Sequence, residues 1–72
     1  MPVEETTDRL SALTSRELQI ARAVAEGLSN RDIAVQLGIT EQTVKNHLTS
    51  VFEKIGVSSR LQLALALVKQ SS

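Results

Sequence analysis

Three short triplets, each made of a glycine, an aliphatic residue and Ser or Thr, divide the sequence. They are GLS at Gly27, GIT at Gly38 and GVS at Gly56. A glycine just past the end of a helix adopts the left-handed conformation without steric strain and closes the last turn. A Ser or Thr two residues later is a favourable N-cap for the next helix. Each triplet therefore predicts the end of one helix and the start of another, and three such joints predict four helices.

Composition favours the same all-α architecture. The chain has 72 residues, enough for one domain with a modest core. Phe52 is the only aromatic residue, so Leu, Ile, Val and Ala must fill the core, which favours helix packing over a β-sandwich. The absence of cysteine and the single histidine, His47, exclude disulfides, thiolate zinc sites and multi-histidine metal sites. We expect an all-α, four-helix domain without a cofactor.

Caps and apolar periodicity set the expected boundaries. The first helix begins at Thr14, where TSRE matches a capping box with Glu17, and runs to about Glu26. The second begins after Ser29 and ends near Leu37, the third runs from after Thr40 to near Ile55, and the fourth begins after Ser58 and runs toward Lys69. Residues 1–12 are polar and acidic, and we expect a tail or linker remnant there, with residues 13–72 as the domain.

The third helix has one apolar stripe and one unusual polar face. At about 100° per residue, the stripe consists of Val44, Leu48, Val51 and Ile55. The opposite side carries Gln42, Lys45, Asn46 and Thr49, with Thr43 and His47 on the flank. A solvated face is the ordinary interpretation of such a pattern. Asn, Thr and Gln, however, favour helix less than a Glu–Lys ladder does, and they hydrogen-bond base edges and phosphates. We therefore interpret this side as a DNA-contact surface.

The joint before the third helix supports that interpretation. Around the turn glycine Gly38, the small residue Ala34 lies four positions earlier, where two crossing helices need a short side chain. The apolar positions around it are Ile33, Leu37, Ile39 and Val44. Together these offsets form a helix-turn-helix pattern, in which the second helix is presented to the major groove of DNA.

Residues 13–66 resemble the LuxR-type (FixJ/NarL-type) helix-turn-helix domain, the DNA-binding C-terminal part of many bacterial response regulators and quorum-sensing regulators. The matching words are LTSRE at Leu13, GLSNRDIAVQLGIT at Gly27, TVKNH at Thr43 and KIGVSSR at Lys54, followed by a small-apolar run after Leu61. The resemblance implies a four-helix domain that binds DNA as a dimer with its third helix in the major groove.

Carried over by position, the resemblance implies roles for individual residues. Lys45 and Asn46 would be the main base-edge or base-and-phosphate contacts, with Thr49 one turn later. Thr43 and His47 would lie near phosphates. The family often has a basic residue where Thr49 stands, so that contact departs from the family pattern. The recurrence of Glu17 and Arg60 in such domains also leads us to expect an ion pair between the first and fourth helices.

The fourth helix, RLQLALALVK, is apolar all round. We expect the side with Leu61, Ala64, Leu65 and Val68 to pack on the domain, and the side with Leu63, Ala66 and Leu67 to remain free as a dimer interface. The alternative is that the second side merely covers the domain's own core. A helical dimerisation or protein-interaction module without DNA contact is the competing function.

Charge limits the strength of any DNA attraction. Formal net charge is zero, and because residues 1–12 carry three acids and one arginine, a net of −2, the other 60 residues sum to +2. The longest apolar run, Leu63 to Val68, is too short to span a membrane. The sequence has no nucleophile constellation and no carboxylate pair in an evident cleft, and because all three glycines serve as joints it has no glycine loop to hold a phosphate. We expect a non-enzymatic bacterial cytoplasmic protein, nucleoid-associated when bound, whose partners are double-stranded DNA, a second copy of the chain and, as a further candidate, RNA polymerase. We expect no small-molecule ligand.

Overall fold

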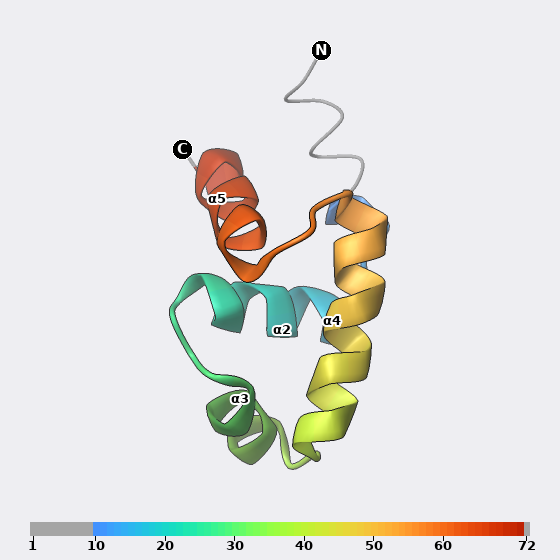
Figure 1. Cartoon of the computed structure of the whole chain (residues 1–72), viewed down its shortest axis with the longest axis vertical. Helices are drawn as coiled ribbons and strands as arrows, with labels where there is room; N and C mark the ends of the chain where they lie inside the picture. The colour runs from blue at the N-terminus through green and yellow to red at the C-terminus, as the bar shows by residue number, and fades with distance from the viewer. Residues whose placement is uncertain (1–9, 72) are drawn as a thin grey trace.

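The computed structural model describes residues 10–71, and over that range it contains four helices and no strand (Figure 1). The helices are α2 (Ser15–Ala25), α3 (Asn30–Leu37), α4 (Glu41–Ile55) and α5 (Arg60–Ser71). Two further helical residues, Leu10 and Ser11, precede α2. The predicted all-α, four-helix fold is confirmed, and each joint falls at one of the glycine triplets. Within the described range, no helix is long and apolar enough to cross a membrane.

Side-chain caps begin the first three helices as predicted. The Thr14 hydroxyl accepts from the Glu17 backbone N–H at 3.1 Å, and the Glu17 carboxylate accepts from the Thr14 N–H at 2.9 Å. The same reciprocal pair links Ser29 and Asp32 in α3, at 3.1 and 3.5 Å. The Thr40 hydroxyl accepts from a backbone N–H in the first turn of α4 at 3.1 Å. These caps satisfy N–H groups that have no partner within the helix.

The start of the last helix was predicted one residue too early. The cap is Ser59, whose hydroxyl accepts from the Gln62 backbone N–H at 3.2 Å, and α5 begins at Arg60. Ser58 instead donates its backbone N–H and its hydroxyl to the Gln62 side-chain oxygen, at 2.8 and 3.1 Å. Two consecutive serines have the same capping chemistry, so the sequence alone does not distinguish them. In the structure the cap is Ser59, which lies three residues before the Gln62 N–H that it accepts from.

Helix α2 lies at the centre of the fold (Figure 1). Both α4 and α5 pack against it, and α3 packs mainly against α4. The buried core is aliphatic and consists of Ile20, Ala21, Val24, Ile33, Ala34, Val44, Leu48, Val51, Ile55, Leu63 and Leu67. In Figure 1, α3 and the start of α4 form one end of the molecule, while α5 lies on the other side of α2.

The joint between α3 and α4 has helix-turn-helix geometry. Gly38 adopts the left-handed conformation, with φ 67° and ψ 34°, and the Ile39 N–H donates to the Ala34 carbonyl at 3.0 Å. Ala34 is 6 % exposed and Val44 is fully buried, so the small residue and the apolar residue predicted at these offsets lie in the core. A left-handed cap at Gly38 therefore ends α3 and lets the chain turn into α4.

The predicted tail, residues 1–12, falls mostly outside the described residues. Of its last three members, Leu10 packs against the core, and its carbonyl accepts from the Leu13 N–H at 3.1 Å. Apolar contact therefore begins before the predicted domain boundary at residue 13. The division of the chain at this boundary stays a prediction.

The Gly38 turn yields a stability prediction. An added Cβ would meet no atom within 4 Å, so backbone conformation alone should determine the effect of Gly38→Ala. We expect Gly38→Ala to lower the unfolding free energy by about 1 kcal/mol, and Gly38→Asn to lower it less, because Asn tolerates the left-handed region. Urea unfolding followed by circular dichroism measures both values. Equal losses for Ala and Asn would contradict this explanation.

Candidate nucleic-acid interface

The N-terminal half of α4 presents its predicted polar side to solvent. Gln42, Lys45, Asn46 and Thr49 are exposed, and we call these four residues the polar face; Thr43 and His47 beside it are half-buried. On the opposite side of the same turns, Val44 and Leu48 are 0 and 4 % exposed. All six residues predicted to contact DNA thus lie on or beside one accessible surface, and their contact with DNA stays a prediction.

Several hydrogen-bonding groups of this surface are already paired. The Gln42 side-chain nitrogen Nε2 donates to Asn46 Oδ1 at 3.0 Å. The Thr49 hydroxyl donates to the Lys45 backbone carbonyl at 3.1 Å. None of these bonds uses the Lys45 ammonium or the Asn46 amino group, so both remain available as donors to a ligand.

The charge of this surface is small. Lys45 is the only lysine or arginine among the six residues predicted to contact DNA. Glu41 is an exposed acid in the first turn of α4. A carboxylate there stabilises the helix dipole but repels a phosphate. Hydrogen bonding and shape must therefore contribute more than net charge to any binding by one copy.

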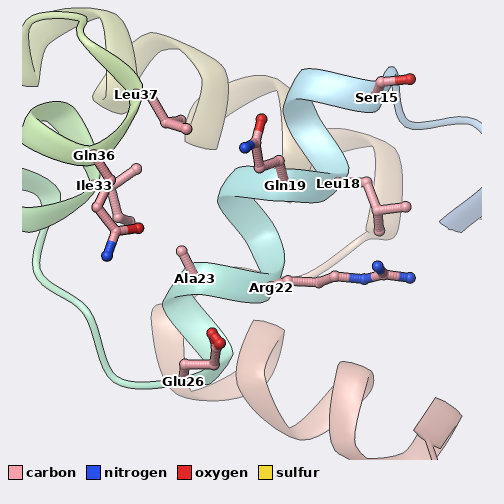
Figure 2. A pocket seen from close by; sticks show the side chains of 9 residues that line it. All are labelled: Ser15, Leu18, Gln19, Arg22, Ala23, Glu26, Ile33, Gln36 and Leu37. Carbon is pink, nitrogen blue, oxygen red and sulfur yellow. The ribbon is translucent and has the colours of Figure 1, made fainter.

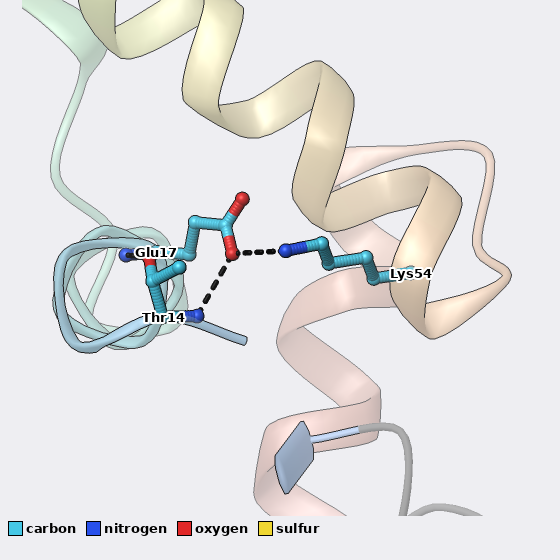
Figure 3. Close-up of polar contacts among 3 residues, drawn as sticks. All are labelled: Thr14, Glu17 and Lys54. Carbon is cyan, nitrogen blue, oxygen red and sulfur yellow. Dashed lines mark hydrogen bonds and ion pairs between the residues drawn. The ribbon is translucent and has the colours of Figure 1, made fainter. Parts of the chain in front are cut away.

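The buried carboxylate of Glu17 holds the C-terminal half of α4 in place (Figure 3). Lys54 Nζ lies 2.8 Å from Glu17 Oε1, and Glu17 is only 5 % exposed. The predicted ion pair between Glu17 and Arg60 is therefore wrong. The first turn of α2 faces the last turns of α4, a contact between residues 37 positions apart that no local periodicity indicates.

The surroundings of Glu17 favour its ionised form. The Lys54 ammonium contributes most, followed by the Thr14 backbone N–H and the Ser50 hydroxyl, and together they lower the pKa of Glu17 from 4.5 to about 2, although burial acts in the opposite direction. Because a charge-assisted hydrogen bond is stronger than a neutral one, this cluster holds α4 firmly against the start of α2.

Arg60 has different partners from the one predicted. Its guanidinium donates to Asn30 Oδ1 at 2.6 Å and to the Leu28 carbonyl at 2.8 Å. These bonds link the first residue of α5 to the joint before α3 and to the first residue of α3. The sequence gives no signal for them, because their partners lie 30 and 32 residues away.

The two sides of α5 are reversed relative to the prediction. Leu63 is fully buried and Leu67 is 8 % exposed, while Ala66 is half-buried against the core. The exposed apolar residues are instead Leu61, Leu65 and Val68, at 69, 50 and 56 %. A helix that is apolar all round has no contrast between its sides, so its pattern did not determine which side packs on α2.

A groove of about 400 Å³ lies between α2 and α3 (Figure 2). Gln36 and Leu37 of α3 face Gln19 and Ala23 of α2 across it. None of the six residues predicted to contact DNA lines this groove. In the part of the chain that the structure describes, no group of three or more His, Cys, Asp or Glu residues is placed to hold a metal ion.

The family described as bacterial regulatory proteins, luxR family, matches residues 11–67. The chain belongs to this family. The match includes α2, α3, α4 and most of α5, together with the whole α3–α4 joint. The resemblance to LuxR-type domains, which the sequence motifs indicated, is therefore confirmed.

Curated relatives of this luxR-family chain are named as regulators. The putative HTH-type transcriptional regulator Mb0914c of Mycobacterium bovis is 44% identical over 61 residues, which cover 85% of this chain and 7% of that protein. The nitrate/nitrite response regulator protein NarP of Escherichia coli is 43% identical over 63 residues, covering 88% and 29%. The transcriptional regulatory protein LnrK of Bacillus subtilis is 40% identical over 65 residues, covering 90% and 30%. The chain thus spans less than a third of each of these relatives. No solved structure gives a significant match.

The Glu17 cluster predicts a pH-dependent stability. Because the folded-state pKa is lowered to about 2, the stabilisation is fully present above pH 4.5 and is lost as pH falls toward 2. We expect Glu17→Gln to lower the unfolding free energy at pH 7 by about 2 to 3 kcal/mol, allowing for the partial exposure of Lys54. The difference from wild type should shrink between pH 4.5 and pH 2 in urea unfolding.

The matched control is Glu53→Gln, at an exposed position of α4, whose stability should keep the wild-type pH dependence. A Glu17→Gln protein whose stability differs from wild type by the same amount at pH 7 and pH 2 would contradict the role of this charge.

Proposed function

We propose that this chain binds double-stranded DNA sequence-specifically, with α4 in the major groove, as the DNA-binding part of a bacterial transcription regulator. The observation that carries the proposal is the exposed polar face of α4, opposite the buried stripe of the same helix. Family membership and the names of the relatives support it. The similarity to NarP supports a response-regulator context, with signal reception elsewhere in a longer protein.

Groove dimensions are consistent with this arrangement. The major groove is about 12 Å wide, which admits one α-helix. With the N-terminal half of α4 inserted, Lys45 and Asn46 reach base edges, while Gln42 and Thr49 contact neighbouring positions. The half-buried Thr43 and His47 approach the phosphate backbone at the rim of the groove. Phosphate contacts then position the domain, and base contacts select the sequence.

The weak charge of a single copy favours a homodimer on DNA. Leu61, Leu65 and Val68 lie at spacings of four and three residues, so they form one exposed apolar row on α5. In Figure 1, α2 separates α5 from the start of α4, so pairing through α5 leaves both polar faces free. Two copies on an inverted repeat double the contacts of one.

The apolar row on α5 by itself also favours a second function, a dimerisation module without DNA contact. Ionic strength separates the two functions. DNA binding weakens steeply with salt because counterions are released from the duplex, whereas apolar association does not. RNA polymerase is a further proposed partner of the DNA-bound regulator, in the bacterial cytoplasm.

We expect Lys45→Ala to weaken binding to a selected duplex by about 1 to 3 kcal/mol, because it removes a base-edge or phosphate donor from the polar face. Thermal unfolding should be unchanged, because Lys45 is exposed. Fluorescence anisotropy with a duplex selected from a random pool, repeated over a range of salt concentrations, measures the loss. Arg16→Ala, an exposed cation on α2, is the matched control and should bind nearly as wild type. Unaltered affinity of Lys45→Ala would remove this face from the mechanism.

We expect Leu65→Glu to abolish cooperative binding to two inverted half-sites, because it places a charge within the apolar row. Affinity for a duplex with one half-site should change little. Val35→Glu, which places the same charge at a 76 % exposed apolar position of α3, should keep the cooperativity. Gel-shift titrations with one-site and two-site duplexes make the comparison. Full cooperativity in Leu65→Glu would contradict dimerisation through α5.

A further inference from the structure

Two amide side chains on the polar face are joined to each other. Gln42 and Asn46 lie one helical turn apart, both exposed, and Gln42 Nε2 donates to Asn46 Oδ1 at 3.0 Å. Side-chain pairs at this spacing on a helix support each other, and an amide pair leaves each member with one group occupied. The orientation of the Asn46 amide is therefore set by its neighbour.

That orientation limits which bases Asn46 can recognise. Bidentate recognition of adenine requires both ends of the amide, because Oδ1 accepts from the adenine amino group while Nδ2 donates to N7. The bond directs Oδ1 toward Gln42 and occupies one of its two lone pairs, so we infer that the Nδ2 donor is the main group that Asn46 offers to a ligand. A donor alone is better matched by guanine, which offers the acceptors O6 and N7, or by thymine O4, than by adenine, whose N7 acceptor lies beside an amino group that itself donates.

Two other members of the polar face, Lys45 and Thr49, are compatible with the same bias. Lys45 carries only donors. The Thr49 hydroxyl donates to the Lys45 carbonyl, with 3.1 Å between the two oxygens, so its hydrogen is already used and its methyl group can make apolar contact. Donors and a methyl group suit guanine and thymine, whose major-groove edges carry keto oxygens and, in thymine, a methyl.

We propose that Gln42 is a specificity-determining residue that acts through Asn46. By orienting the Asn46 amide, it makes Asn46 read a keto-bearing base, guanine or thymine, rather than adenine. The inference rests on the proposed function, since it requires the polar face to meet base edges. It assigns Gln42 the role of a positioning residue for Asn46.

The first step of the test locates the base pair that Asn46 reads. The wild-type chain selects a duplex from a random pool, and all single-base variants of that duplex are then measured by competition. The position at which Asn46→Ala loses its base preference is the one read by Asn46. We expect guanine or thymine to be preferred there by the wild-type protein.

Variants of Gln42 then test the coupling at that position. Gln42→Met keeps nearly the same length without hydrogen bonding, so the preference for guanine or thymine over adenine should fall by about two- to tenfold. A carboxylate only accepts, so Gln42→Glu should make Asn46 donate Nδ2 to it and expose Oδ1. The relative preference should then move toward adenine or cytosine, whatever the overall loss of affinity caused by the added charge. Gln36→Met, exposed on α3, is the matched control and should keep the wild-type preference.

The outcomes separate this inference from the function on which it rests. A wild-type preference for adenine at the Asn46 position, or a wild-type pattern retained by Gln42→Met and Gln42→Glu, overturns the inference alone. An Asn46→Ala protein with the wild-type preference at every position overturns both the inference and the reading of bases by Asn46.

Discussion

The buried stripe of α4 fixes the orientation on which the rest of the domain depends. Val44, Leu48, Val51 and Ile55 are each no more than 4 % exposed, so the helix cannot rotate about its axis without moving apolar side chains into water. Because successive residues are about 100° apart, burying this stripe forces the polar face outward. The Glu17–Lys54 pair adds a polar link near the far end of the same helix.

The arrangement divides the molecule into two ends joined by α2. The start of α4, with α3 beside it, forms one end, and α5 packs on the other side of α2 (Figure 1). Arg60 connects the two ends through its bonds to Leu28 and Asn30. In the proposed dimer, this connection would hold each polar face at a fixed position relative to the α5 row, which a fixed half-site spacing requires.

Local signals predicted the features that local chemistry determines. The glycine triplets and the cap residues located all four helices to within a residue or two, and the periodicity of α4 identified its buried stripe and exposed polar face. The offsets around Gly38 identified the turn because a left-handed helix end favours glycine and because the residues at the flanking apolar offsets pack into or against the core.

Contacts between distant residues could not be predicted in this way. The partner of Glu17 proved to be Lys54, and Arg60 bonds to Asn30 and the Leu28 carbonyl, because helix crossing rather than spacing brings these residues together. The buried side of α5 was assigned incorrectly, because leucine and alanine surround that helix on all sides. The contacts of the polar face with DNA remain predictions of its chemistry.

The most direct test is an NMR titration of isotope-labelled protein with the duplex it selects. If α4 reads the major groove, the largest shifts should fall on the polar face, including the side-chain amides of Gln42 and Asn46 and the backbone amides around Lys45. Shifts confined to α5 or to the groove between α2 and α3, with the polar face unchanged at saturation, would contradict major-groove recognition by α4.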